Sequence, residues 1–356
     1  MKTLPIILIL TSFIVSLPLM GEDDFFVPKT TIGGYGELHY NYKKADGAEA
    51  SKTLDFHRFV LFFSHAWSEK WSFKAEVELE HNFVKDGQGE LELEQAYIDY
   101  HPSDVLGFQV GVVLPSAGLI NEFHEPPLFM SVERPDYHKY IIPTTWFGNG
   151  LALYGKYKGF DYKLTIMEGL EGDAISLSNG LRKARRKGFK PEVDALLYNF
   201  RLAYTAIPGL RIGASYSYNN TKNADNMDNP VTIAEGHVKY DANNVYAVFE
   251  IGRIGYGEGV LKTSSGYYFD IGYNIGSFFD IPTRIYPWFR WTEYDTAREV
   301  RAADVVDNTY RVRKWLVGLS VKPHPSVVFK AEAGVEKRGP DNAKSNVFNV
   351  GAGYMF

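Results

Sequence analysis

The chain has 356 residues with 38 basic and 43 acidic side chains, so its formal net charge is only −5, and it contains no cysteine. This balance gives no support for a nucleic-acid partner, and the lack of cysteine excludes disulfides, thiol chemistry and a lipid-modified cysteine. Aromatic residues make up 15% of the chain and glycines number 33, a composition that suits the outer face, the interfaces and the bends of a transmembrane β-barrel.

The N-terminal segment 1–21 has the layout of a Sec signal peptide. Lys2 supplies the positive charge, a mostly apolar run follows it, and the small residue Gly21 precedes a charged stretch. A membrane-anchoring helix is the alternative, but the run is short for a span of about 20 residues and lacks a basic flank. We therefore expect cleavage and export to the bacterial outer membrane, with a periplasmic arm at 22–31 and a barrel at 32–356.

Alternation of apolar and polar residues with a period of two runs through the rest of the chain. Segment 71–83 shows it best, because its apolar residues share one parity and its lysine and glutamates share the other. A helix would spread these charges around its circumference, whereas a strand places them all on one face. The same alternation returns at 210–218, 245–251 and 329–336, which predicts strands with one face toward lipid and one toward water.

About sixteen segments of roughly ten residues fit tilted strands that cross the hydrocarbon. They begin near residues 32, 55, 71, 90, 108, 149, 159, 195, 210, 231, 244, 264, 283, 311, 327 and 346. Their connections alternate between tight turns, one of them at Pro282, and mostly longer polar loops. The sequence therefore predicts an all-β fold, a transmembrane antiparallel up-and-down barrel with short periplasmic turns and longer extracellular loops.

Three segments do not keep one parity. Segment 90–100 changes face near Glu94-Gln95, which predicts a β-bulge, while 54–67 and 286–295 allow either face. The last strand keeps its parity and ends on Phe356, an aromatic residue on the lipid-facing side. This ending resembles the signal that barrel-assembly machinery reads, so we expect that machinery as a partner during biogenesis.

A barrel of about sixteen strands is too wide for side chains to fill, so we expect water in its lumen. The inward parity carries charges of both signs, and opposed charges across a pore set up a transverse field that discriminates weakly between anions and cations. We expect the pore to be lined by Lys74, Glu76, Glu78, Glu80, Arg201, Arg211, Glu250, Lys330 and Glu332.

The longest connection, 115–148, is the expected constriction loop. It holds many apolar residues and prolines, so we expect it to fold inward against the barrel wall; packing over a neighbouring protomer of a trimer is the alternative. The spacing of its histidine and glutamates matches no metal motif, so we expect polar rim groups paired with Arg134 or Lys139, with no metal and no cofactor. The expected constriction residues are Glu122, His124, Glu125 and Arg134.

The fourth long loop carries the densest run of charge in the chain. Its cations are Arg182, Lys183, Arg185, Arg186, Lys187 and Lys190. At a pore mouth they would concentrate anions and steer them inward. Binding to the phosphates of lipopolysaccharide and simple solvation are the alternatives.

Four motifs spread along the mature chain resemble those of bacterial porins of the phosphate-selective O and P type. They are Gly34-Tyr35-Gly36-Glu37, the LEQAYIDY segment 93–100, Val110-Gly111 leading to Leu114-Pro115-Ser116, and Pro323-His324-Pro325 followed by Lys330. The resemblance implies a sixteen-stranded barrel, usually trimeric, with inward-folded loops. It also implies that phosphate selectivity would need a ladder of lumenal arginine and lysine, which the mixed charges predicted here do not form.

The sequence contains no motif of a nucleotide-binding loop, a metalloprotease or a serine hydrolase, so we expect no enzyme. The main hypothesis is a porin, a passive channel for small hydrophilic solutes or ions, with anions as one candidate. The alternative is a non-conducting barrel that acts as a surface receptor or adhesin, which requires loop 115–148 to project outwards or to plug the bore. A third hypothesis, a hydrolase at the barrel rim, would depend on His39 or His81.

Overall fold

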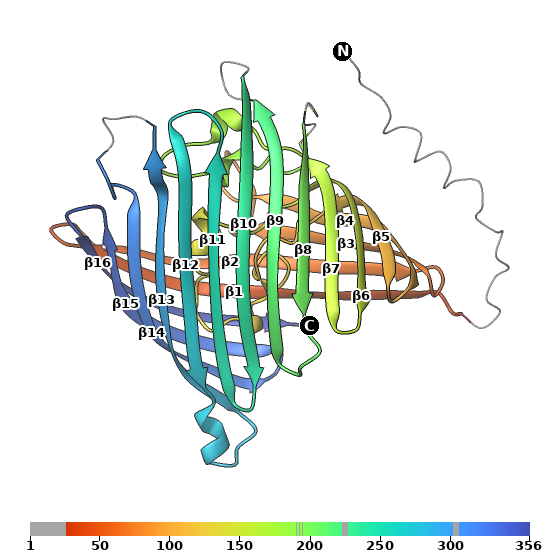
Figure 1. Cartoon of the computed structure of the whole chain (residues 1–356). Helices are drawn as coiled ribbons and strands as arrows, with labels where there is room; N and C mark the ends of the chain where they lie inside the picture. The colour runs from red at the N-terminus through yellow and green to blue at the C-terminus, as the bar shows by residue number, and fades with distance from the viewer. Residues whose placement is uncertain (1–25, 190, 192, 194, 223–226, 302–305) are drawn as a thin grey trace.

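The computed structural model describes residues 26–189, 191, 193, 195–222, 227–301 and 306–356, and the expected signal peptide lies outside them. Within these residues sixteen antiparallel strands close into one barrel, in which each strand pairs with its neighbours in the chain and the first pairs with the last (Figure 1). The strands are β1 (Lys29–Ala45), β2 (Ser51–Ala66), β3 (Trp71–Glu80), β4 (Leu91–Ser103), β5 (Leu106–Val113), β6 (Gly148–Tyr157), β7 (Phe160–Glu168), β8 (Leu196–Tyr204), β9 (Leu210–Lys222), β10 (Asp228–Ala242), β11 (Val245–Tyr256), β12 (Leu261–Tyr273), β13 (Arg284–Val300), β14 (Arg311–His324), β15 (Val327–Arg338) and β16 (Ala343–Met355). The predicted barrel is confirmed.

Each strand begins within four residues of its predicted start. On β3 the exposed Trp71 and Val77 face outward, while Glu76 and Glu78 face inward and are buried. The first strand begins at Lys29, so the expected periplasmic arm overlaps it. None of the helices in the described part of the chain has the length and apolar character that a membrane span requires.

The connection between β12 and β13 differs from the prediction, because the tight turn expected at Pro282 is wrong. The 3-10 helix η4 (Ile275–Phe278) lies there instead, at the foot of the barrel in Figure 1. The Asn274 side-chain oxygen accepts hydrogen bonds from the backbone N–H groups of Gly276 and Ile285, at 3.2 and 2.9 Å. This cap turns the chain out of the sheet directly after β12, so the connection to β13 is longer than a tight turn.

The predicted bulge in β4 is confirmed. Gln95 pairs with Glu76, but the next pair joins Leu93 to Val77, so Glu94 has no residue opposite it. The extra residue turns the Glu94 side chain into the barrel, where it is fully buried.

A second bulge, in β2, was not predicted. Arg58 pairs with Glu37 and Phe56 pairs with Leu38, which leaves His57 as the extra residue between them. The bulge explains why this part of β2 fits neither parity, since it adds an inward-facing side chain to the regular alternation.

The long connection between β5 and β6, called loop 3 here (residues 114–147), lies inside the barrel. It contains the 3-10 helix η1 (Pro126–Leu128) and the short helix α2 (Tyr137–Tyr140). Apolar side chains of loop 3, among them Ile141 and Trp146, are buried and form the core together with residues of the barrel wall. The core of this protein therefore fills part of the bore.

The connection between β7 and β8, called loop 4 here (169–195 with the gaps given above), also folds inward. It contains η2 (Gly172–Ala174) and η3 (Arg182–Ala184). Leu181 is fully buried, and the hydroxyl of Thr296 on β13 donates a 2.6 Å hydrogen bond to the Leu177 carbonyl. Loop 4 thus lies across the bore next to loop 3.

Candidate functional site

Loop 3 is attached to β11, β12 and β13 by buried polar contacts. The Nε2 atom of His138 lies 2.8 Å from a carboxylate oxygen of Glu250. Arg290 donates from Nε to Asp270 at 2.6 Å and from Nη1 to the hydroxyl of Ser131 at 2.5 Å. Burial lowers the pKa of His138 to about 3, so this histidine is neutral and binds Glu250 through a ring N–H.

On the side of β7 and β8, the carboxylate of Glu122 attaches loop 3 to the wall. It lies 3.4 Å from the Lys163 ammonium and 3.6 Å from the Arg201 guanidinium, and it accepts a 2.6 Å hydrogen bond from the Ser116 hydroxyl. Burial alone would raise the pKa of Glu122, but the two cations and the hydroxyl lower it to about 2. Glu122 is therefore ionised at neutral pH.

Toward β3 and β4 the contact is made by His124. Its Nε2 atom lies 3.3 Å from Glu76 and 3.6 Å from Glu94, both buried. The expected pairing of the loop acids with Arg134 or Lys139 is wrong, because the cations near Glu122 come from β7 and β8. Arg134 instead donates to the backbone carbonyl of His124 at 3.5 Å. The pairing depends on which strands face the loop, and spacing within the loop carries no such information.

The expected pore-lining residues all lie on the inward parity, but loop 3 covers several of them. Glu250, Lys330 and Glu332 are only 0, 4 and 2% exposed. They hold loop 3, as when the Glu332 carboxylate accepts a 2.8 Å hydrogen bond from the backbone N–H of Val132. The set therefore divides into buried side chains, namely Glu76, Glu78, Arg201, Glu250, Lys330 and Glu332, and more accessible side chains, namely Lys74, Glu80 and Arg211.

Six basic side chains from six strands contact the side of loop 3 that faces the short turns. This basic belt consists of Lys163, Arg201, Arg211, Lys239, Lys322 and Lys330. The ammonium groups of Lys239, Lys322 and Lys330 bind backbone carbonyls of loop 3 at 3.5, 2.6 and 2.7 Å. In the described part of the chain, these three ammonium groups have no carboxylate within ion-pair distance. None of the three therefore forms a direct ion pair.

A cavity of about 530 Å³, called the vestibule here, lies on the other side of loop 3, between loops 3 and 4 and strands β1 and β2. Its lining includes the side chains of His39, His57, His81, Glu133, Arg182 and Arg185. Because these groups are polar or charged, the vestibule is a space that water and hydrophilic solutes can occupy.

The cations expected at the pore mouth are placed mostly against other parts of the chain, and Lys190 lies outside the described residues. Arg185 donates to the carbonyl of Thr145 at 2.9 Å, and the Arg182 guanidinium lies 5.9 Å from the ring centre of Tyr140. Lys187 binds Glu90 at 2.8 Å and also Glu92, Arg186 is half-buried, and Lys183 is exposed. The run folds inward because buried apolar residues of loop 4 lie within and beside it.

Sequence analysis did not identify three residues of this region as part of the site. Lys322 shares the inward parity of β14, which is a signal that could have identified it. His57 lies in an unpredicted bulge, and Glu133 lies in a loop without periodicity. No sequence pattern would have shown that the last two meet.

Comparison with known proteins gives one family and several similar folds. The model of the family described as phosphate-selective porin O and P matches residues 32–250. An uncharacterised protein of Aquifex aeolicus (strain VF5) is 31% identical over 351 residues, covering 92% of this chain and 80% of that relative.

Solved structures share the barrel at low sequence identity. The outer membrane channel DcaP of Acinetobacter baumannii aligns with a TM-score of 0.63 at 15% identity, over 95% of this chain and all of that chain. An anion-selective porin from Comamonas acidovorans aligns with a TM-score of 0.61 at 10% identity, over 93% of this chain and all of that one. At these identities the likeness establishes the fold.

Proposed function

The chain belongs to the family of phosphate-selective porins O and P and is an outer-membrane porin, and we propose that it admits small hydrophilic solutes by passive diffusion with a preference for anions. The observation that carries the anion preference is the basic belt beneath loop 3. Its six cations come from both sides of the bore, whereas the carboxylates nearest to it are fewer and pair with only part of it.

The geometry supports a route with two stages. A solute would enter the vestibule from the loop end of the barrel, pass the polar edge of loop 3, and leave through the belt at the turn end. A cluster of fixed cations in a narrow space of low dielectric raises the local concentration of anions and lowers that of cations. Loop 3 would act as the constriction, because it crosses the bore between the vestibule and the belt.

We also propose the cellular setting from the family and the sequence. The signal peptide 1–21 would direct export, and the barrel-assembly machinery would insert the chain into the outer membrane among lipid and lipopolysaccharide. The outward faces of the strands carry exposed apolar side chains that suit contact with lipid. A trimer is the proposed assembly, by analogy with the trimer form in which one fold relative, OmpT of Vibrio cholerae, has been solved.

Planar-bilayer recording tests this function. The purified protein should give ohmic conductance steps, and in a tenfold gradient of potassium chloride its reversal potential should have the sign set by chloride. Phosphate, the solute in the family's description, should then be added to chloride to measure whether it reduces the chloride current. A reversal potential with the sign set by potassium would contradict the anion preference.

A non-conducting receptor is the second candidate, and one observation favours it. Loops 3 and 4 together bury a large apolar cluster inside the bore, which leaves less open cross-section than a wide barrel offers. Silence of correctly folded protein in bilayers would support the receptor. The same silence would exclude the channel.

A further inference from the structure

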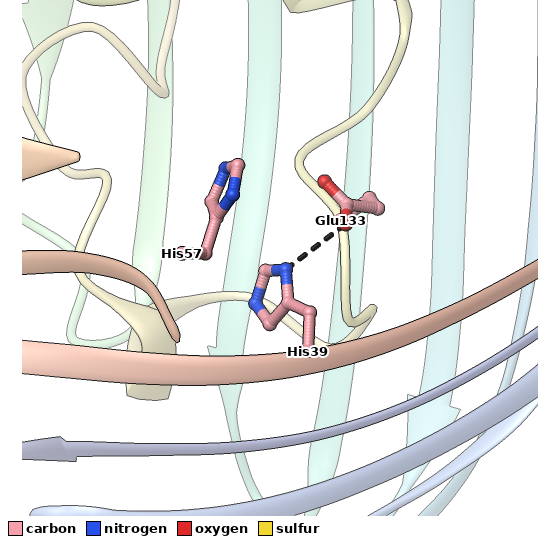
Figure 2. A group of neighbouring side chains, drawn as sticks. All are labelled: His39, His57 and Glu133. Carbon is pink, nitrogen blue, oxygen red and sulfur yellow. Dashed lines mark hydrogen bonds and ion pairs between the residues drawn. The ribbon is translucent and has the colours of Figure 1, made fainter. Parts of the chain in front are cut away.

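Three histidines from three neighbouring strands meet in the vestibule. His39 lies on β1, His57 on β2, and His81 directly follows β3. The rings of His39 and His57 stack with centres 4.9 Å apart, and those of His57 and His81 meet edge to face at 5.4 Å. Figure 2 shows His39 and His57 next to Glu133, which approaches from loop 3. Sequence positions far apart are thus brought to one wall of the cavity.

The bulge in β2 lies at the centre of the cluster. Regular pairing places Asp55 opposite His39 on the inward face, and His57 is the extra residue of the bulge. Bulges often redirect a side chain toward a functional site. In a regular strand Asp55 and His57 already share one face, and the bulge places Arg58 on that face as well.

Carboxylates lie at hydrogen-bond distance from each ring. The Nδ1 atom of His39 is 2.9 Å from Glu133, and its Nε2 atom is 3.1 Å from Glu37. The Nδ1 atom of His57 is 3.0 Å from Asp55, which also lies 2.7 Å from Nδ1 of His81. Glu37 and Asp55 are therefore placed to hold a ring N–H of His39 and of His57, which leaves the other nitrogen of each ring available as a ligand.

The ligand atoms are close enough to share one ion. One atom each from His39, His57 and Glu133 lie within 4.8 Å of one another, and the same holds for Asp55, His57 and His81. Two imidazoles and one carboxylate, with water in the open position, form a usual zinc donor set with bonds of about 2.0–2.2 Å. His57 belongs to both groups, so it is the central residue of the cluster.

We propose that the vestibule binds a divalent transition-metal ion of the zinc class through His39, His57 and Glu133. Asp55 and Glu37 orient the two rings, and His81 lies beside His57 as a further nitrogen donor. The vestibule gives a hydrated ion a path to the ligands. Arg58, next to His57 in the chain, also lines the vestibule, and its charge is met by Glu37 at 2.7 Å and Glu78 at 3.4 Å.

The ion would connect the barrel wall to loop 3, since two ligands lie on β1 and β2 and the third lies in the loop. This tether would hold the constriction in its narrow position. Metal binding would then reduce conductance, a consequence that rests on the proposed channel function. Binding itself does not depend on conduction.

Calorimetric titration of the folded full barrel in detergent with zinc chloride, after removal of metal with EDTA, tests binding. Wild type should bind one zinc ion per chain, and His57→Gln and Glu133→Gln should each weaken binding by at least about tenfold. His65→Gln is the matched control, because His65 lies on the same strand outside the cluster and should leave binding unchanged. Absence of zinc binding by wild type, or equal binding by His57→Gln, would overturn the site, and so would equal affinity for calcium.

Bilayer recording then tests the tether. Zinc should lower the wild-type conductance, EDTA should restore it, and His57→Gln should not respond. Unchanged wild-type conductance at a zinc concentration that saturates the calorimetric site would overturn the tether. A protein that binds zinc but never conducts would contradict the channel and leave the metal site supported, so the two failures are distinguishable.

Discussion

The phenol of Tyr137 in loop 3 lies directly over the backbone of Gly252 on β11. A Cβ atom at Gly252 would overlap the Tyr137 hydroxyl and would lie 3.2 Å from the Ile142 side chain. Because Gly252 has no side chain, loop 3 can approach the wall this closely. Where the wall presents a side chain instead, the loop would stand further into the bore.

Replacing Gly252 tests the role of loop 3 as a constriction. Gly252→Val should displace the loop, change the single-channel conductance, and destabilise the barrel by about 1–3 kcal/mol through overpacking. The measurements are bilayer conductance and the temperature at which the heat-modified band appears in gel electrophoresis. Gly236→Val on β10 is the control, because a Cβ there would have only the Gly213 carbonyl oxygen within reach, at 4.0 Å. Identical behaviour of the two variants would show that Gly252 does not determine how closely loop 3 approaches the wall.

The hydrogen bond from His138 to Glu250 is the second attachment of loop 3. His138→Ala removes the donor that approaches most closely, so that Glu250 keeps only contacts at 3.3 Å from the Leu119 amide and the Tyr268 hydroxyl. A buried polar group that loses a hydrogen-bond partner costs about 1–3 kcal/mol. We expect faster hydrogen exchange across loop 3, measured by mass spectrometry, with unchanged exchange in the strands remote from it. Unchanged exchange in loop 3 would show that the apolar contacts alone hold it.

These contacts mark where prediction from sequence succeeds and where it ends. The alternation on β3 shows which side chains meet lipid, because a charge placed in hydrocarbon is costly. The strands and the direction of their side chains can therefore be predicted from the local pattern. The bulge at Glu94 was visible because the parity changes there. The bulge at His57 was not visible, because segment 54–67 carries phenylalanine, histidine and arginine on both parities and no single position marks the change.

The loops could not be predicted in the same way. Arg185 was expected in water at the pore mouth, yet it binds backbone carbonyls of loop 3. A carbonyl and a water molecule are both good acceptors, so a run of cations does not reveal which one it meets. Glu122 likewise finds its cations on β7 and β8, and only the closed barrel brings those strands to the loop.

The basic belt predicts a selectivity change. Lys239→Gln with Lys322→Gln should shift the reversal potential in a salt gradient toward that of potassium, because two cations without a direct carboxylate partner are removed. The effect should shrink at high ionic strength, since salt screens the remaining field. Lys262→Gln is the control, because this lysine is exposed near the loop end and pairs with Glu299 at 3.1 Å. A control variant that shifts the potential as much as the double variant would place the selectivity elsewhere.

The ion pairs of Glu122 predict a dependence on pH. Its pKa is lowered from the ordinary value of 4.5 to about 2, because Lys163 and Arg201 outweigh the opposing effect of burial. A carboxyl with a lowered pKa stabilises the folded state fully above its ordinary pKa, and this contribution is lost as the pH falls toward about 2. The attachment of loop 3 to β7 and β8 should therefore be constant from pH 8 to about 5 and weaken below that range.

Glu122→Gln carries no charge at any pH, so at pH 7 it should lack the attachment that wild type loses only as the pH falls to about 2 and below. The difference between variant and wild type, in conductance and in resistance to heat, should be largest at neutral pH and shrink steadily below about pH 4.5. Glu69→Gln, in the exposed turn between β2 and β3, is the control and should match wild type throughout. If the difference between Glu122→Gln and wild type stays the same down to pH 2.5, the loss comes from packing of the side chain, and the charge of Glu122 does not hold the loop.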